Sequence, residues 1–448
     1  MIRIEDKTKC CGCGACAARC PKGCIHMQPD DEGFLYPRTD TTACVACGRC
    51  EEVCPELNPL PARKPLRAVA AVCQDEALRL QSSSGGIFSL LAETVLARGG
   101  VVFGARFDKQ WQVITDYTES LEGLAAFRGS KYVQAAVGGA YKDCERFLKE
   151  GREVLFSGTP CQIAGLQGFL GRDYKTLTLV DVACVGVPGP GLWQDYLSAL
   201  TGARTELIRD VRFRDKSAGW RDSRFVLQFA APVPASRTAS ETAGPSAAAS
   251  SKTERLLEIS MPRYKNPFFQ ALNTGLTARP GCYTCRFKSE GRSGSDLTLA
   301  DCWGVEQLLA VGTPGVPAWD NGCPTSLLTD DKGTSLVIAR SEKGAGLLDS
   351  LGVTGCDCDY AAAVALNAGL RAGALRHPGR EDFFRQYVRL RERAAQAPAA
   401  ASCGNGTPAP SGPKDSLWLD RLLKKAVTPP LHRKILNKLS ALAGKARK

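Results

Sequence analysis

Histidine is scarce in this sequence, and its scarcity excludes several kinds of active site. The 448 residues include three histidines, His26, His377 and His432. Because histidine is the side chain that most readily titrates near neutral pH, we expect no histidine-based acid–base or metal catalysis. A Ser/His/Asp set and a Walker-type phosphate loop are also missing. The chemistry must therefore depend on other side chains.

Long hydrophobic runs are missing as well. No apolar stretch reaches the roughly 20 residues that a helix needs to cross a bilayer, and Met1–Lys9 has no apolar core of a secretory signal. The composition, 44% hydrophobic and 23% charged, is that of a globular protein with room for roughly two or three domains. We therefore expect a cytoplasmic protein whose cysteines are thiols or metal thiolates.

Cysteine, by contrast, is abundant, with 21 residues in the chain. Near the N-terminus the run C-x2-C-x2-C-x3-C-P occurs twice, at Cys10, Cys13, Cys16, Cys20 and Pro21, and again at Cys44, Cys47, Cys50, Cys54 and Pro55. Three closely spaced thiolates wrap one face of a cubane, and in two-cluster ferredoxins the fourth comes from the other run. We therefore predict two [4Fe–4S] clusters, with the ligands Cys10, Cys13, Cys16 and Cys54, and Cys44, Cys47, Cys50 and Cys20.

Zinc sites or a disulfide framework are the alternative interpretations of these runs. Zinc sites commonly use paired C-x2-C, which gives no reason for the x3-C-P ending of both runs, so a ferredoxin module is favoured. Cys11 and Cys24 are surplus to the pattern, and we treat them as bystanders. An electron-transfer module is not itself an active site, so a further redox centre is expected downstream.

Composition divides the chain into five segments. Short apolar runs that alternate with helical patterns and Gly-rich turns predict an α/β core after the N-terminal α+β module. We expect strands at Ala68–Cys73, Val101–Ala105, Val154–Ser157 and Leu177–Cys184, and helices at Ile87–Arg98 and Tyr141–Lys149. The predicted segments are 1–60 (ferredoxin module), 66–200 and 201–395 (the two parts of the core, with a disordered insertion at 231–252), 396–413 (linker) and 414–448 (basic tail).

Three passages of the core have the composition of ligand-binding loops. Ser82–Gly86 opens a helix, where free N–H groups favour a phosphate, although plain caps are the commoner use of such residues. Gly129–Tyr132 offers a hydroxyl, a cation and an aromatic face, or is a surface loop. Ser157–Gln162 follows a strand, which is where α/β folds place ligands.

A fourth passage contains the C-x2-C pair Cys282 and Cys285. Such a pair is typical of zinc, of a redox disulfide or of part of a cluster. With Cys161 and Cys184 it makes four thiols, enough for one more cubane, whereas Cys161 and Cys184 taken separately are typical of buried structural cysteines.

Together these passages resemble the beta subunit of coenzyme F420-reducing hydrogenase and its dehydrogenase relatives. The similar blocks are SSSGGIFSLLA from residue 82, GSKYVQ from 129, SGTPCQIAGL from 157, DVACVGVPGPGLW from 181, IRDVRFRDKSAGW from 208, GCYTCRFKSEGRSGSDLTLADCWGV from 281 and HPGREDFF from 377. The resemblance covers roughly residues 66–390 in order, and many bacterial members of this family carry an N-terminal two-cluster ferredoxin.

The resemblance implies an FAD in the core and a third [4Fe–4S] cluster beside it. Around the flavin it implies Ser84, Gly85, Gly86, Ser130, Lys131, Tyr132, Ser157, Gly158, Thr159 and Pro160. For the cluster it implies Cys161, Cys184, Cys282 and Cys285. Lys131 is the candidate catalytic residue, neutralising charge near the flavin, and Arg286 and Lys288 are candidates for binding anionic substrate groups. Cys302 and Cys323 depart from the family pattern, and we assign neither a role.

The predicted function is that of an iron–sulfur flavoprotein oxidoreductase. It would pass electrons between a ferredoxin-like or other redox protein, the clusters, FAD and a small-molecule substrate, which is coenzyme F420-like or another organic acceptor. A non-catalytic electron-transfer subunit of a larger redox complex is the alternative.

The C-terminal tail holds most of the excess positive charge. Residues 414–448 contain ten Lys or Arg and two Asp, which is +8 of the chain's +12. Leucines at 417, 419, 422 and 423 share one helical face, and a second apolar set follows Pro430. We expect this tail to be a solvated helix, or to contact an anionic membrane surface or an acidic partner. Nucleic-acid binding is not expected, because no recognition fold accompanies the charge.

Overall fold

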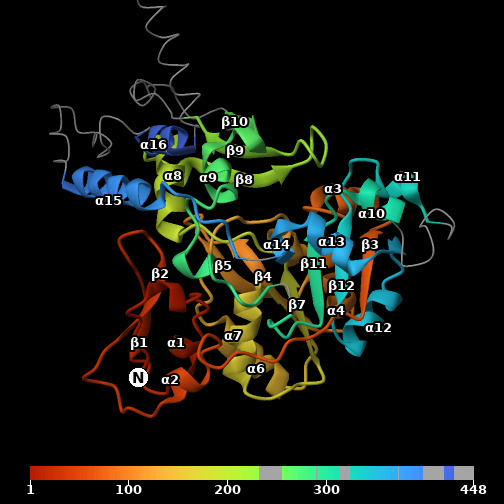
Figure 1. The fold of residues 1–448 in the computed structure, drawn as a ribbon, viewed down its shortest axis with the longest axis horizontal. Coiled ribbons are helices and arrows are strands. Elements are labelled where there is room, and N and C mark those ends of the chain that lie inside the picture. Colours follow the sequence, from red (N-terminus) through yellow and green to blue (C-terminus); the bar gives the residue numbers. More distant parts are fainter. Residues whose placement is uncertain (232–254, 289–290, 312–322, 372, 397–417, 428–448) are drawn as a thin grey trace, which may run out of the picture.

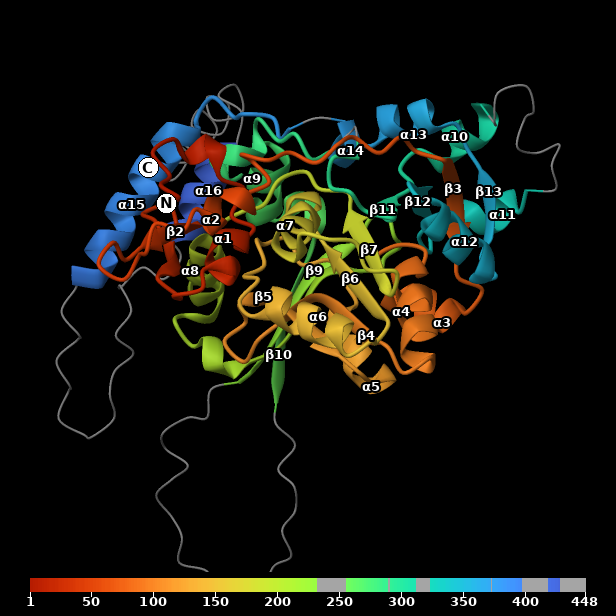
Figure 2. The same cartoon turned by 90° about the horizontal axis from the view of Figure 1, so that it is seen from below.

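The computed structural model describes residues 1–231, 255–288, 291–311, 323–371, 373–396 and 418–427. In this part of the chain an eight-stranded sheet forms the centre, and a two-stranded and a three-stranded sheet lie beside it (Figures 1 and 2). The order of the large sheet is β13-β3-β12-β11-β7-β6-β4-β5. The predicted α/β core behind an N-terminal module is thereby confirmed.

The strands of the large sheet are β3 (Arg67–Val72), β4 (Val101–Phe107), β5 (Val113–Thr118), β6 (Val154–Gly158), β7 (Leu177–Val182), β11 (Leu297–Asp301), β12 (Ser335–Ala339) and β13 (Thr354–Asp357). The helices around it are α3 (Glu76–Gln81), α4 (Ile87–Ala97), α5 (Leu121–Leu124), α6 (Ala140–Lys149), α7 (Pro160–Leu170), α10 (Val305–Val311), α11 (Thr325–Leu328), α12 (Glu342–Ser350), α13 (Tyr360–Leu366) and α14 (Ala368–Arg371). The six elements expected from the apolar pattern between residues 68 and 184 are all present, with ends shifted by at most two residues.

Apolar residues line both faces of this sheet, as helices on each face require. Phe103 and Phe156 pack with the residues of α6 and α7 in one hydrophobic cluster. Val102 and Leu155, one position along their strands, pack with the residues of α4 and α12 in another. Because successive side chains point to opposite faces, these continuous apolar runs form buried central strands.

The N-terminal module consists of β1 (Ile25–Pro29), β2 (Leu35–Thr39), α1 (Ala15–Arg19) and α2 (Arg49–Glu52). It packs on α7, since Cys13 and Ala15 share a hydrophobic cluster with α7 residues. At the β1–β2 turn, Gly33 adopts a φ of +83°, and a Cβ there would lie 2.9 Å from the Cα of Gly191. Backbone therefore meets backbone where the module contacts the start of the next helix, α8 (Pro190–Thr201).

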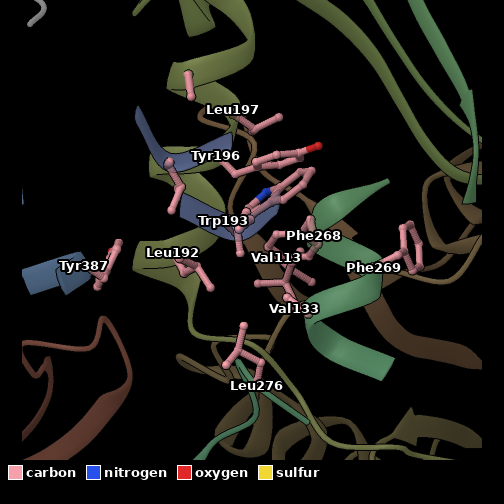
Figure 3. Packing of buried hydrophobic residues seen from close by; sticks show 14 of the residues in the cluster. Val113, Val133, Leu192, Trp193, Tyr196, Leu197, Phe268, Phe269, Leu276 and Tyr387 are labelled. Carbon is pink, nitrogen blue, oxygen red and sulfur yellow. The ribbon is translucent and has the colours of Figure 1, made fainter. Parts of the chain in front are cut away.

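A third layer combines the strands β8 (Ile208–Asp215), β9 (Arg224–Ala230) and β10 (Leu256–Pro262) with α8, α9 (Pro267–Asn273), α15 (Arg380–Gln396) and α16 (Trp418–Val427). Trp193 is the largest fully buried side chain. Its indole contacts Phe213, with ring centroids 4.8 Å apart, and Phe268, with ring centroids 5.4 Å apart (Figure 3). Its N–H donates to the carbonyl of Trp111 at 2.8 Å. This aromatic cluster anchors the layer.

The described part of the C-terminal tail corrects one expectation. Leu419, Leu422 and Leu423 are buried in the cluster around Trp193, and α16 packs against α8 and α9 (Figure 1). The apolar face predicted to be solvated or to contact a membrane or partner therefore packs within the chain instead. Residues 428–448 lie outside the described residues, as do the predicted insertion and linker apart from Ala231 and Gln396.

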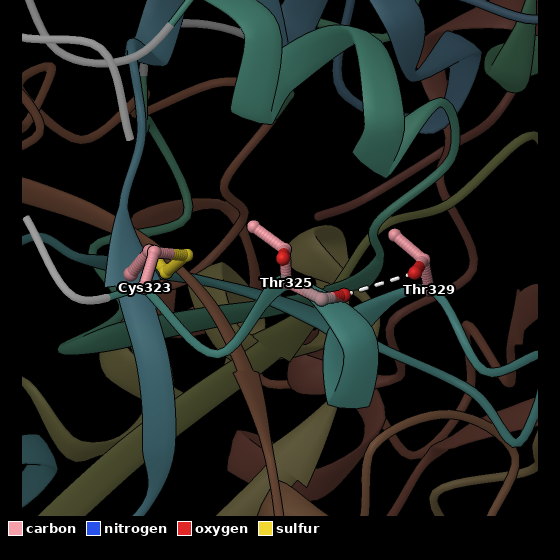
Figure 4. The surroundings of a disulfide bond; sticks show 4 residues. Cys323, Thr325 and Thr329 are labelled. Carbon is pink, nitrogen blue, oxygen red and sulfur yellow. Dashed lines mark hydrogen bonds between the residues drawn. A yellow bond between two sulfur atoms is a disulfide. The ribbon is translucent and has the colours of Figure 1, made fainter. Parts of the chain in front are cut away.

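A second correction concerns the state of the cysteines. Cys323 and Cys356 form a disulfide, with Cα atoms 5.6 Å apart (Figure 4). This separation lies in the usual range for such a bond, and Cys356 belongs to the edge strand β13. The expectation that cysteines are thiols or metal ligands is wrong for this pair.

No helix among the described residues is long and apolar enough to cross a membrane.

Candidate functional site

Most of the predicted ligand-binding loops leave the same edge of the large sheet. β4, β6, β7 and β11 are parallel, and β3 runs in the same direction because it and β11 are both antiparallel to β12. The carboxyl ends of these strands, where α/β folds bind ligands, lead into Ser82–Gly86, Thr159–Cys161, Cys184 and Cys302–Trp303. Segments far apart in sequence thus meet at one edge.

The N-terminal module contains two cysteine-lined cavities. We call them the inner cavity, next to α7, and the outer cavity. The inner cavity is lined by Cys10, Cys13, Cys16 and Cys54, with Cys11 beside them. The outer cavity is lined by Cys20, Cys44, Cys47 and Cys50, with Cys24 beside them. These are the two crossed sets expected from the cysteine runs, brought together here by the fold.

The two runs wrap their cavities with the same backbone. Gly12 and Gly14 have φ values of +73° and +77°, and Ala46 and Gly48, at the matching positions of the second run, have +52° and +75°. Gly14 and Gly48 precede α1 and α2, which carry Cys16 and Cys50. Left-handed turns between closely spaced cysteines bring their thiols to one side, as a cubane requires.

A third group of cysteines gathers where the module meets the sheet edge. Cys161 lies at the start of α7, Cys184 follows β7, and Cys282 ends a short 3-10 helix. Burial raises the pKa of Cys282 and, next, so do the negative charges of Cys184 and Cys161. Burial and the charge of Cys161 raise the pKa of Cys285 to about 12. The thiols of Cys161, Cys184, Cys282 and Cys285 thus influence one another's pKa, and we call these four residues the quartet.

A buried lysine without a partner supports an anionic group at the quartet. Lys288 is 6% exposed, and its Nζ has no hydrogen-bond partner among the described residues. Its positive charge acts to lower the pKa of both Cys184 and Cys285, so it lies close to them. An isolated buried ammonium costs several kcal/mol, and a cluster bound through four thiolates would carry the compensating charge. No three His, Cys, Asp or Glu side chains in the described ranges are placed to hold a single metal ion.

Cys11 joins the inner cavity to the quartet. Its thiol lies against those of Cys13 and Cys161, and Cys13 and burial raise its pKa well above the usual value. The residue expected to be a bystander is thus in contact with both groups of candidate ligands. Cys24 lies 3.3 Å from Cys20, sulfur to sulfur, at the outer cavity.

The serine and glycine loops predicted to bind flavin form one connected group. Ser130 donates to the hydroxyl of Ser83 through its N–H at 2.6 Å and its Oγ at 2.9 Å. Ser84 donates to the carbonyl of Thr334 at 2.7 Å, and Gly86 begins α4 with a φ of +90°. Tyr132 extends the group toward β8, with its ring 5.8 Å from that of Phe213.

The loop after β6 completes this edge. The buried hydroxyl of Ser157 donates to the carbonyl of Phe103 at 2.9 Å. Thr159 forms the N-terminal capping box of α7, after Gly158 and before Pro160, and its Oγ1 lies 3.3 Å from the sulfur of Cys161. The predicted flavin loop thus leads directly to a cysteine of the quartet.

Lys131 is engaged with its own loop. Its Nζ donates to the carbonyls of Ala126 and Arg128, each at 2.8 Å, and burial lowers its pKa to about 7. Arg286, a candidate for binding anionic substrate groups, lies 3.6 Å from Glu56, which lines the inner cavity. Cys302 is buried in the core beside Cys358.

Sequence reasoning missed two cations of β8 and the loop after it. Arg214 is buried and pairs with Asp301 at 2.6 Å, while its Nε and Nη2 have no acceptor among the described residues. Lys216 donates to three carbonyls, among them that of Ser84 at 2.7 Å. Both belong to the block IRDVRFRDKSAGW, whose paired charges within a strand pattern were the available signal. They place positive charge beside the serine and glycine loops.

The packing at this edge of the sheet leaves no room for a side chain at Gly85. A Cβ on Gly85 would lie 2.4 Å from the carbonyl oxygen of Ala71 and 2.8 Å from the nitrogen of Ser335. We expect Gly85→Ala to lower the free energy of unfolding by about 1–3 kcal/mol. Gly346→Ala in α12, where a Cβ meets nothing within 4 Å, should instead raise it by up to about 1 kcal/mol. Urea titrations of both variants test this, and an unchanged midpoint for Gly85→Ala would contradict it.

Lys216 predicts a pH dependence of definite sign. Burial and the charges of Arg214 and Arg79 lower the pKa of Lys216 to about 7, whereas an unfolded lysine keeps its proton to about pH 10.4. Between these values the unfolded chain binds more protons, so the free energy of unfolding rises with pH. Relative to Lys216→Met, the wild type should gain about 1 kcal/mol per pH unit above about pH 7.5 in urea titrations. Parallel pH profiles would contradict the prediction.

Comparisons with known proteins find two matching family models. Residues 151–366 match the family model for the C terminus of the coenzyme F420 hydrogenase/dehydrogenase beta subunit, and residues 9–57 match that of the 4Fe-4S dicluster domain. No curated protein matches the chain. A chain in a solved structure of the F420-reducing [NiFe] hydrogenase complex from Methanosarcina barkeri is similar, with 15% identity and a TM-score of 0.39, over 64% of this chain and 79% of that one.

Proposed function

We propose that this chain, which carries the C-terminal domain of the coenzyme F420 hydrogenase/dehydrogenase beta-subunit family behind a 4Fe-4S dicluster domain, is an iron–sulfur flavoprotein oxidoreductase. It would pass electrons between ferredoxin-type clusters, FAD and a small organic substrate, coenzyme F420-like or another acceptor. A redox protein would exchange electrons at the outer cavity, where Cys47 is exposed. The observation that carries the proposal is the continuity of the thiol groups from the outer cavity to the sheet edge.

That continuity rests on adjacent residues. The outer and inner cavities share the two crossed cysteine runs. Cys11 contacts Cys13 of the inner cavity and Cys161 of the quartet. Thr159, in the predicted flavin loop, contacts the same Cys161. Electron transfer between redox centres needs short gaps, and the contacts of Cys11 and Thr159 link the inner cavity, Cys161 and the predicted flavin loop.

We infer that an FAD binds at the sheet edge. The loops Ser84–Gly86, Ser130–Tyr132 and Ser157–Pro160 would hold it, with Arg214 beside them. The unpartnered Nε and Nη2 of Arg214, and the unpartnered indole N–H of Trp220, are buried donors without acceptors in the described part of the chain. Such donors cost free energy until an acceptor binds, and phosphate or flavin oxygens are suitable. A bound flavin exchanges two electrons or a hydride with substrates and single electrons with iron–sulfur clusters.

Anaerobic purification followed by iron, sulfide and flavin analysis of one sample tests the proposal. Three clusters and a flavin predict about twelve irons and one FAD per chain. About eight irons without flavin would contradict the flavoenzyme and the third cluster together. About twelve irons without flavin would leave an iron–sulfur carrier.

A non-catalytic electron-transfer subunit is the second candidate. The family model describes a beta subunit, which favours work beside other subunits. Reduction of an artificial acceptor by the isolated, flavin-loaded chain with a panel of hydride donors distinguishes the two. Turnover with any donor supports the enzyme, and flavin that is reduced only by another redox protein supports the subunit.

A further inference from the structure

Arg279 is a buried cation placed between the two inner groups of cysteines. It is fully buried, and its backbone N–H donates to the carbonyl of Val187 at 3.0 Å. Its side chain reaches into the N-terminal module, where Nε donates to the carbonyl of Cys10 at 2.8 Å and Nη1 to that of Leu35 at 3.0 Å. The guanidinium therefore connects the segment that carries Cys282 to the first cysteine run.

The second set of contacts holds the guanidinium against sulfur. Nη2 lies 3.4 Å from the sulfur of Cys10, and Nη1 also donates to Oε1 of Gln134 at 3.0 Å. The carbon between the nitrogens lies 4.0 Å from the ring centre of Tyr36. Gln134 in turn donates from Nε2 to the carbonyl of Cys11 at 3.0 Å. These hydrogen bonds and the contact with Tyr36 hold the guanidinium in one position.

No carboxylate lies within ion-pair distance of Arg279 among the described residues. A buried guanidinium without a counter-charge costs several kcal/mol. The nearest groups able to supply that charge are the thiolates of the inner cavity and of the quartet.

We propose that Arg279 is a positioning residue that raises the reduction potential of the cluster at Cys10, Cys13, Cys16 and Cys54 and holds it beside the quartet. The inference rests on the proposed function, because it requires that cluster. Reduction takes one electron from a reductant such as dithionite and makes or breaks no bond, so one negative charge is added next to the guanidinium. A fixed positive charge and an N–H···S contact both favour the reduced state.

Redox titration of the purified, cluster-loaded chain, followed by electron paramagnetic resonance, tests this. In Arg279→Gln, the ratio of reduced to oxidised inner cluster at the wild-type midpoint potential should fall about tenfold, equivalent to about 59 mV for one electron. Arg279→Lys, which keeps the charge, should change the ratio less than about threefold. The outer cluster of the same molecule, and the inner cluster in Arg79→Gln, which removes another buried arginine, should keep their potentials.

A milder variant covers the case in which Arg279→Gln loses its cluster. Gln134→Glu keeps the shape of the residue and adds a carboxylate to Nη1 of Arg279, so it should shift the inner potential in the same negative direction. An unchanged inner potential in Gln134→Glu and in a loaded Arg279→Gln would overturn the inference while leaving the proposed function intact. A wild-type chain that binds no iron at the N-terminal module would overturn both.

Discussion

Cys20→Ser combined with Cys24→Ser is expected to empty the outer cavity and leave the inner one loaded. Cys20 ends the first run, yet it lines the outer cavity with the first three cysteines of the second run. The double variant is needed because Cys24 lies 3.3 Å from Cys20 and offers a substitute thiol. Iron should fall by about four per chain, and one of the two cluster signals of the N-terminal module should vanish from paramagnetic resonance spectra.

The reciprocal variant, Cys54→Ser, should remove the other signal. Cys54 ends the second run but lines the inner cavity with Cys10, Cys13 and Cys16, so the crossed arrangement predicts loss of the inner cluster. Cys144→Ser, at a buried cysteine that lines neither cavity, is the control and should keep full iron. If Cys54→Ser and the Cys20/Cys24 double variant removed the same signal, the crossed assignment would be wrong.

Lys288→Met is expected to have opposite effects on the metal-free and the loaded chain. In the metal-free chain the variant removes a buried ammonium that has no hydrogen-bond partner among the described residues, so the free energy of unfolding should rise by about 3 kcal/mol. In the loaded chain the same change removes the positive charge next to Cys184 and Cys285. The cluster at the quartet should then be held less tightly.

Two measurements test whether Lys288→Met has opposite effects on the metal-free and the loaded chain. Anaerobic urea titration of the metal-free chain reports the stability, and the rate of iron loss to a chelator reports the hold on the cluster, expected to be about tenfold faster in the variant. Lys109→Met, at an exposed lysine that lines neither cavity, is the control and should alter neither. A Lys288→Met variant destabilised in both states would show that the ammonium has a structural partner and no relation to the quartet.

The features that could be predicted from the sequence are those set by residues close together in the chain. Closely spaced cysteines with repeated prolines define their own backbone turns, which is why the expected crossed sets line the two cavities. Apolar strands between Ala68 and Cys184 were recognisable because both faces of the central sheet are covered. The metal and flavin content of these sites stays a prediction that the iron and flavin analysis addresses.

Groups whose role depends on distant neighbours were not recognisable in the same way. Arg279 and Cys10 are 269 residues apart in sequence, and nothing near Arg279 distinguishes it from a surface arginine. Cys11 looked surplus because the run is complete without it, yet the docking of the module places it against Cys161. Only the fold brings such pairs together.

The two wrong expectations have a related cause. The leucines of α16 form an amphipathic pattern, which shows that one face will be covered but not by what; here the cover is α8 and α9. Likewise, the cysteine count pointed to metal thiolates, but Cys323 and Cys356 are brought together by the edge strand β13. Pairing partners of this kind are set by topology.

The contact at Gly33 limits how this molecule can be rebuilt. Because a side chain at Gly33 would collide with the backbone of Gly191, a foreign ferredoxin grafted in place of the module must supply glycine at the equivalent turn. It must also offer carbonyls for the guanidinium of Arg279 in the places of Cys10 and Leu35. Chimaeras that respect only the cysteine spacing should therefore assemble clusters but dock poorly. The N-terminal module and the rest of the chain must therefore be exchanged, or inherited, together.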